Sequence, residues 1–137
     1  MINANELRIG NWVTGNFPYM IVKTISNGSF DLYMPGSDAD DFSFDDNEID
    51  PIPLTPEILE KCGFVAAPDH DEYGGWLSPK ITRVQRDTEY RMRIMKDSYG
   101  FYYTPDSKSI IIRVDSVHKL QNLFYIYIDS ELEVNLK

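Results

Sequence analysis

The sequence predicts an α+β fold, in which a β-rich first part leads into a short helix, and an antiparallel sheet then packs on a C-terminal helix. Three observations support this. An Asn-Gly pair separates two apolar runs near the start, which is a strong signal for a β-hairpin. A Thr-Pro pair at 55–56 is typical of a helix start. Near the end, the spacing of the apolar residues changes from about 3.6 to 2, as where a helix is followed by a strand.

Residues 1–54 are expected to form a bent β-meander or a small SH3-like barrel. Asn27 and Gly28 suit a type I′ turn, which needs positive φ at both central residues. A two-residue turn fixes the register, and the expected pairs are Ser26–Ser29, Ile25–Phe30, Thr24–Asp31 and Ile21–Met34. This register gathers five apolar side chains on one face of the hairpin: Ile21, Ile25, Phe30, Leu32 and Met34.

Seven acidic residues crowd the segment 38–50. Because like charges repel and carboxylates bury little apolar surface, this segment is expected to be a solvated loop that folding does not require. Its start resembles a calcium-binding EF-hand loop. However, Ser43 and Ile49 stand where that loop needs glycine and glutamate, so no cation is expected. Pro51 and Pro53 then favour an extended edge segment.

The helix that follows should be short. Thr55 suits the N-cap and Pro56 the first helical position. Gly63 suits the left-handed position that ends a helix, with Phe64 contacting Leu59 as in a Schellman motif. The single cysteine, Cys62, lies at the C-terminal end, where the helix dipole disfavours a thiolate. A packing role is therefore expected for this thiol.

The second half is expected to contain a loop, four strands, a helix and a final strand. The loop covers 65–79, because it holds an acidic run and the pair Gly74-Gly75. The expected strands are Ile81–Gln85, Glu89–Met95, Tyr99–Tyr103 and Ser109–Val114. Asp115 is expected to cap the last helix, and the apolar stripe of that helix is formed by Val117, Leu120, Leu123, Phe124 and Tyr127. A final strand is expected where Leu132, Val134 and Leu136 alternate with polar residues.

We expect three parts, 1–54, 55–72 and 73–137, which could also form one domain. Apolar residues at 42% and charged residues at 26% are typical of a soluble globular protein. No apolar run is long enough for a membrane helix, and the first residues lack the features of a signal peptide. A cytoplasmic protein without a membrane partner is expected.

Three motifs resemble a known family: Leu7–Val13 (LRIGNWV), Ile52–Leu59 with Cys62–Phe64, and Val117–Phe124 (VHKLQNLF). In this order they resemble a family of short, uncharacterised proteins from Bacteroidetes genomes and their phages or mobile elements. Lys119 stands where that family more often has glutamine. The resemblance implies no activity, no cofactor and no catalytic residue.

Candidate chemistry is sparse. No nucleophile, base and orienting group can be named together, and no phosphate loop or serine elbow is present. We therefore predict no catalytic residue, no metal and no cofactor. His70 and His118 are too far apart in sequence for a typical zinc pair, and a surface or half-buried histidine is the expected case. His118 and Gln121, one helical turn apart, are candidate contacts with a partner.

A second group of candidates lies in a basic region within 80–96, although the whole chain carries a net charge of −9. The candidate anion or nucleic-acid contacts are Arg83, Arg86, Arg91 and Arg93. Arg91 and Arg93 should share the solvent face of one strand, with Tyr90 on the opposite face. Single-strand nucleic-acid platforms combine basic and aromatic side chains on one face, so the placement of Tyr90 weakens this reading.

The function favoured by the sequence is a non-enzymatic binding or accessory protein that acts through a protein partner or self-association. The alternative is a nucleic-acid-binding accessory factor that uses the basic region. An enzyme is the third reading.

Overall fold

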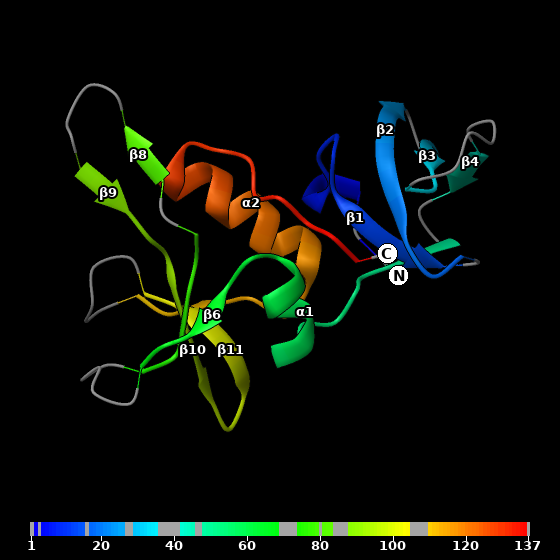
Figure 1. Cartoon of the computed structure of the whole chain (residues 1–137). Helices are drawn as coiled ribbons and strands as arrows, with labels where there is room; N and C mark the ends of the chain where they lie inside the picture. The colour runs from blue at the N-terminus through cyan, green and yellow to red at the C-terminus, as the bar shows by residue number, and fades with distance from the viewer. Residues whose placement is uncertain are drawn as a thin grey trace. The chain divides into compact units, whose positions relative to one another are not determined.

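The computed structural model describes residues 2, 4–15, 17–26, 29–35, 42–45, 48–68, 74–79, 81–83, 88–104 and 110–136. Contacts divide the chain into two compact units. Unit 1 comprises Met1–Pro53, Ser116–Asn122 and Leu136–Lys137, and unit 2 comprises Leu54–Asp115 and Leu123–Asn135. Each unit holds one five-stranded antiparallel sheet and part of the helical structure (Figure 1). The predicted α+β class is confirmed.

The sheet of unit 1 has the strand order β4-β3-β2-β1-β5. Its elements are the 3-10 turn η1 (Ala4–Glu6) and strands β1 (Trp12–Gly15), β2 (Met20–Ser26), β3 (Ser29–Tyr33), β4 (Phe42–Asp45) and β5 (Ile49–Asp50). Strands β4 and β5 are its two edges, and within the described residues they do not pair with each other. The sheet therefore stays open, and the SH3-like barrel is not found. The extended edge expected over Ile49–Leu54 is a strand only at β5, and Pro53 forms an isolated bridge with Ser116.

The β2–β3 hairpin shows the predicted register only near its turn. Ser26–Ser29, Ile25–Phe30 and Thr24–Asp31 pair as expected, but the register then shifts, so that Ile21 faces Tyr33 instead of Met34. A β-bulge adds one residue to one strand, which exchanges the faces of the residues beyond it. As a result Val22 faces Leu32 and joins the core. Ile25 lies on the turn side of the bulge and pairs as predicted, but it is exposed, so the predicted apolar face is wrong for Ile25. The turn residues 27–28 lie outside the described residues.

The acidic segment, expected to be a loop, contains the strand β4. Phe42 and Phe44 alternate with polar residues, and β4 pairs with β3 along four positions. Phe44 is buried in the core of unit 1. On the exposed side, Asp31 accepts hydrogen bonds from Ser43 and Thr24, and these bonds lower the pKa of the Asp31 carboxyl. Residues 38–41, and with them the comparison to an EF-hand, lie outside the described residues.

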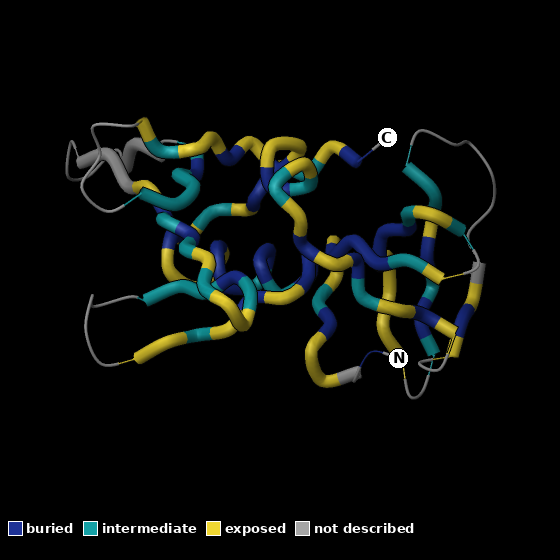
Figure 2. Tube along the Cα trace, turned by 90° about the horizontal axis from the view of Figure 1, so that it is seen from below, coloured by how far each residue is buried: buried dark blue, intermediate teal, exposed yellow. Residues whose placement is uncertain are grey.

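The buried apolar residues of unit 1 form one core cluster, and Figure 2 colours the buried positions of the chain dark blue. It consists of Ile2, Leu7, Val13, Met20, Val22, Phe30, Leu32, Phe44 and Ile49.

Helix α1 (Pro56–Lys61) forms as predicted. The Thr55 hydroxyl accepts a hydrogen bond from Ile58 N at 3.1 Å, which caps the first turn. At the other end, Gly63 has a φ of 87°. Gly63 N donates to Glu60 O and Phe64 N donates to Leu59 O, both at 3.0 Å. These two bonds define the Schellman motif.

The sheet of unit 2 has the strand order β12-β11-β10-β7-β6. Its strands are β6 (Val65–Ala66), β7 (Trp76–Leu77), β10 (Arg93–Asp97), β11 (Gly100–Tyr103) and β12 (Ile112–Arg113), and a separate pair is formed by β8 (Ile81–Arg83) and β9 (Thr88–Tyr90). The expected loop 65–79 therefore has a strand near each end. The acidic run and His70 lie outside the described residues.

One predicted strand, Glu89–Met95, is divided between β9 and β10. Its apolar alternation is real, since Met92 and Ile94 are both buried. The hydrogen-bond partner nevertheless changes at Met92, whose N–H donates to Ser78 Oγ at 2.7 Å and whose carbonyl accepts from Ser78 N at 2.9 Å. The backbone therefore stops pairing with β8 and begins to pair with the chain that contains β7. The pattern of apolar and polar side chains does not reveal this change of partner.

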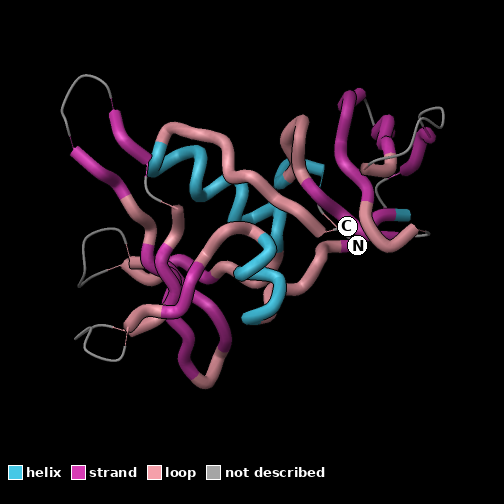
Figure 3. The backbone as a smooth tube through the Cα atoms, viewed as in Figure 1, coloured by secondary structure: helices cyan, strands magenta, loops and turns pink. Residues whose placement is uncertain are grey.

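Helix α2 (Val117–Ile128) begins two residues after Asp115, so Ser116, not Asp115, stands at the cap position. Val117, Leu120, Leu123 and Phe124 are buried as predicted. Tyr127 is 39% exposed, and Ile128 completes the buried stripe instead. Residues 131–136 do not form the expected strand (Figure 3). Their burial alternates, and Asn135 N donates to Lys61 O at 3.1 Å without a strand being formed.

Neither described helix is long and apolar enough to cross a membrane.

Candidate functional site

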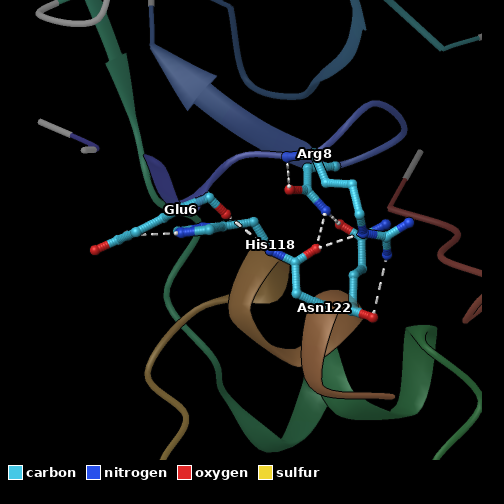
Figure 4. Close-up of polar contacts among 6 residues, drawn as sticks. Glu6, Arg8, His118 and Asn122 are labelled. Atoms are coloured by element: carbon cyan, nitrogen blue, oxygen red, sulfur yellow. Dashed lines mark hydrogen bonds and ion pairs between the residues drawn. The ribbon is translucent and has the colours of Figure 1, made fainter. Parts of the chain in front are cut away.

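A cluster of polar side chains lies between the start of the chain and the first half of α2, all within unit 1 (Figure 4). We call it the polar cluster, and its members are Glu6, Arg8, Asn11, His118, Gln121 and Asn122. His118, Gln121 and Asn122 share one side of the helix because they are three or four residues apart. Asn11, His118 and Gln121 are buried.

Gln121 binds the backbone of the segment before β1. Its Oε1 accepts a hydrogen bond from Trp12 N at 2.8 Å, and its Nε2 donates to Gly10 O at 3.0 Å. Its Oε1 also lies 3.5 Å from Asn11 Nδ2. The Gln121 amide therefore provides these backbone groups with the hydrogen-bond partners that a neighbouring strand would provide.

Asn122 joins a second set of partners. Its Oδ1 accepts from Asn11 Nδ2 at 2.9 Å and from Arg8 Nε at 3.0 Å, and its Nδ2 donates to Glu6 O at 2.8 Å. Asn11 Oδ1 accepts from Arg8 N at 2.7 Å. The Arg8 guanidinium also donates to Gln121 O at 3.4 Å. A buried polar network in which its members bond one another fixes a single arrangement of the chain.

His118 is only 1% exposed, which corrects the expectation of a surface or half-buried histidine. Its Nε2 lies 3.1 Å from Glu6 Oε2. A carboxylate contact provides the polar partner that a buried imidazole needs. His118 and Gln121 thus come together as candidates, but inside the chain. Their contact with a partner stays a prediction.

The remaining members of the polar cluster, Glu6, Arg8, Asn11 and Asn122, were not predicted. One signal was present in the sequence, since Gln121 and Asn122 interrupt an otherwise apolar helical stretch. The cluster also unites two of the motifs that carried the family resemblance, 7–13 and 117–124. Its described groups bond one another and the backbone, an arrangement that orders the chain.

We predict that Gln121→Met lowers the free energy of unfolding by about 1–3 kcal/mol, because it leaves the N–H of Trp12 and the carbonyl of Gly10 without their partner. Methionine keeps the length of the side chain, so little volume is lost. Chemical denaturation followed by circular dichroism measures the change. Lys119→Met introduces the same side chain at a half-exposed position of the same helix and should have little effect.

Of the candidate arginines, the structure describes the side chains of Arg91 and Arg93, which bond to different backbone carbonyls. Arg91 Nε donates to Ser78 O at 2.8 Å, and Arg93 Nη1 donates to Gly74 O. Arg83 ends β8, and Arg86 lies outside the described residues. Arg91 is exposed and Arg93 half-buried, in alternation with buried Met92 and Ile94 as predicted. An anion contact by these arginines stays a prediction.

The outer edge of the unit 2 sheet is a second feature, formed by residues 110–113 beside β11. Ile110 is 55% exposed and Ile111 58%. Val114 N donates to Phe101 O at 3.1 Å, and Ile112 pairs with Tyr103. Since backbone groups alternate sides along a strand, those of Ile112 and Val114 face β11, and those of Ile111 and Arg113 face away from it. We call this side the free edge.

The free edge ends at Asp115. There, on the same side of the strand, Leu54 N donates to Asp115 O at 3.2 Å. Within the part of the chain that the structure describes, no backbone bond reaches Ile111 or Arg113 on that side. On this side of the strand the Asp115 carbonyl therefore already accepts a hydrogen bond, whereas no backbone bond to Ile111 or Arg113 is found within the described residues.

Arg113, on the same strand as the free edge, forms an ion pair with Asp97 at the end of β10. Arg113 Nη1 and Nη2 donate to the two carboxylate oxygens of Asp97 at 2.7 and 2.9 Å. The Arg113 guanidinium also lies 5.5 Å from the Tyr99 ring and 5.4 Å from the Tyr102 ring. The hydrogen bonds from Arg113 lower the pKa of Asp97 to about 2, and the contact raises the pKa of Arg113.

This ion pair predicts a pH dependence. Because folding depresses the pKa of Asp97, its contribution to stability is present above the ordinary value of 3.8 and is lost as the pH falls to about 2. Asp97→Asn should therefore melt at a slightly lower temperature than the natural chain at pH 6, and the two should converge near pH 2. Thermal melts at several pH values give the difference, and a gap that does not change with pH would contradict the prediction.

Cys62 is buried, and burial raises the pKa of its thiol to about 12. The thiolate, which is the reactive form, is thus disfavoured. Among the described residues, no group of three or more His, Cys, Asp or Glu side chains is arranged to hold a metal ion.

No family model, curated protein or solved structure matches this chain. The resemblance to the family from Bacteroidetes and their phages stays a prediction.

Proposed function

We propose that the protein is a non-enzymatic binding or accessory protein that acts through protein contacts made at the free edge. One observation carries this proposal: Ile110 and Ile111 are more than half exposed beside a strand whose outer backbone groups face away from the sheet. Proteins commonly protect sheet edges with charges, prolines or a covering element, because an open edge pairs with other chains. Ile110 and Ile111 make this open edge apolar beside Arg113, whose charge is paired with Asp97, and such an edge favours binding of an extended segment.

The polar cluster supports the same reading in a different way. Its side chains hold residues 6–12 against the first half of α2, which is a structural task. We assign the polar cluster the role of ordering unit 1. Because its side chains are used for this internal role, binding is assigned to the surface of the chain.

The alternative, a nucleic-acid-binding factor that uses residues 80–96, has less support. The guanidiniums of Arg91 and Arg93 are already bonded to backbone carbonyls, and phosphate binding depends on available positive charge. The net charge of −9 also opposes nucleic acid at long range.

The proposal includes a cytoplasmic location, which the single cysteine supports, because oxidising compartments favour disulfide-linked proteins. Through the family resemblance, it also includes an association with phages or mobile elements.

Photo-crosslinking tests the proposal. A photoreactive amino acid replaces Ile110 in the full chain, which is expressed in its natural host, and the adducts are identified by mass spectrometry. We expect a discrete protein adduct that weakens when Ile111→Lys is added. The matched control places the same group at Ile126, which is 69% exposed on α2, and should give no such adduct. Adducts to nucleic acid alone would favour the alternative.

A further inference from the structure

We propose that the free edge binds the free edge of a second copy of this chain, so that two β12 strands pair antiparallel around a two-fold axis. This inference rests on the proposed function and specifies its partner.

The backbone geometry sets the register. Within the described residues 110–114, Ile111 and Arg113 present their N–H and C=O groups to the free edge, so they form the hydrogen-bonded pairs of a strand added there. In a two-fold arrangement Ile111 of each copy can face Arg113 of the other, which gives four backbone hydrogen bonds. Ile112 then faces its own equivalent across the axis. Such self-complementary contacts close on themselves and stop at a dimer.

The charge of Arg113 favours this register over the register shifted by one residue in each copy. A shift of one residue in each copy would place Arg113 opposite Arg113, and like charges directly opposite each other destabilise a pair of strands. In the proposed register each Arg113 faces an isoleucine, and Asp97 of the same copy neutralises its guanidinium at 2.7 Å. The contact therefore brings no unpaired charges together.

The side chains of the free edge also favour a second copy of this chain as the binding partner. Ile110, Ile111 and Ile112 follow one another, and successive side chains of a strand lie on opposite faces. A complementary strand must therefore be apolar on both faces, and this chain's own 110–112 segment meets that requirement. Pairs of β-branched residues across strands are favourable.

The length of the strand pairing at the free edge is also limited. Leu54 occupies the side of the strand at Asp115, so the added strand cannot extend past that point. A short contact between two chains that each carry −9 should be weak at low salt. Because salt screens this repulsion over distances of about 8–10 Å, raising the ionic strength should strengthen the dimer.

Sedimentation equilibrium over a wide concentration range tests association. We expect the natural chain to shift from monomer to dimer, and to shift at lower concentration when salt is raised from low to physiological levels. Ile111→Lys should remain monomeric, whereas Ile126→Lys, an exposed isoleucine on α2, should associate like the natural chain. A natural chain that stays monomeric at every concentration and salt level would overturn the inference.

A disulfide trap tests the register. Ile112 would form a non-hydrogen-bonded pair with its equivalent, in which the Cα atoms are about 4.5 Å apart, within the range that a disulfide spans. Ile112→Cys should therefore give a covalent dimer under mild oxidation, and Ile126→Cys should not. The native Cys62 is buried and should not interfere. Equal dimer yields from both variants would contradict the proposed pairing.

The two proposals fail in different ways. A monomeric chain whose position 110 crosslinks to another protein would overturn the second-copy inference but keep the proposed function. A monomeric chain with no protein adduct would overturn both.

Discussion

Phe44→Ala should lower the free energy of unfolding by about 3–5 kcal/mol, the cost of removing a buried phenylalanine side chain from a core. Phe44 is buried among the apolar residues of unit 1, although it lies in an acidic segment on the edge strand β4. A loss of this size is a large share of the stability of an ordinary domain. Urea denaturation followed by circular dichroism or tryptophan fluorescence measures it.

The matched control is Ser43→Ala on the same strand. Ser43 is exposed and donates one hydrogen bond to Asp31 at 2.6 Å, so its loss should cost far less than that of Phe44. Similar effects of the two substitutions would show that β4 does not contribute to the core.

The acidic segment was expected from the sequence to be a loop that folding does not require, so a Gly/Ser linker in place of 38–46 would leave stability nearly unchanged. The replacement would delete β4 together with Phe44, and we now expect a clear fall in the melting temperature. The many acidic residues favoured a loop in the interpretation of the sequence. The alternation of Phe42 and Phe44 with polar residues, which is typical of a strand, was nevertheless present.

Local signals predicted the parts of the fold that depend on few neighbouring residues. Helix α1 is the best example, because Thr55, Pro56 and Gly63 each act within one turn of their own position. The β2–β3 hairpin was predicted only as far as its turn determines the register. The bulge near Lys23 depends on how the rest of the sheet packs, and the sequence of the hairpin does not specify it.

The polar cluster was largely missed for a related reason. Its bonds join residues more than a hundred positions apart, as in the contact of Arg8 with Asn122. His118 was expected near the surface because an isolated histidine usually lies there, but Glu6 gives it a partner in a buried position. The free edge likewise required the strand pairing, since the run of isoleucines alone does not show which side of β12 remains open.

Leu120→Ala is the second substitution with a large expected effect, a loss of about 2–5 kcal/mol in the free energy of unfolding. Leu120 is fully buried at the centre of the apolar stripe of α2. Removing its side chain leaves a cavity that the closely packed surroundings can fill only in part. Thermal and chemical denaturation should both show a strong decrease.

Ile126→Ala is the matched control on the same helix, because Ile126 is 69% exposed and loses few contacts. Truncating a histidine near the surface, as expected from the sequence, would have little effect. Since His118 is buried beside Glu6, we now expect His118→Ala to destabilise the chain as well. If Leu120→Ala left the unfolding midpoint unchanged but abolished self-association, the stripe of α2 would be an interface, and the dimer would not depend on the free edge. If it lowers the midpoint while Ile111→Lys alone abolishes association, core and interface lie on different elements, as the burial of Leu120 and the exposure of Ile111 indicate.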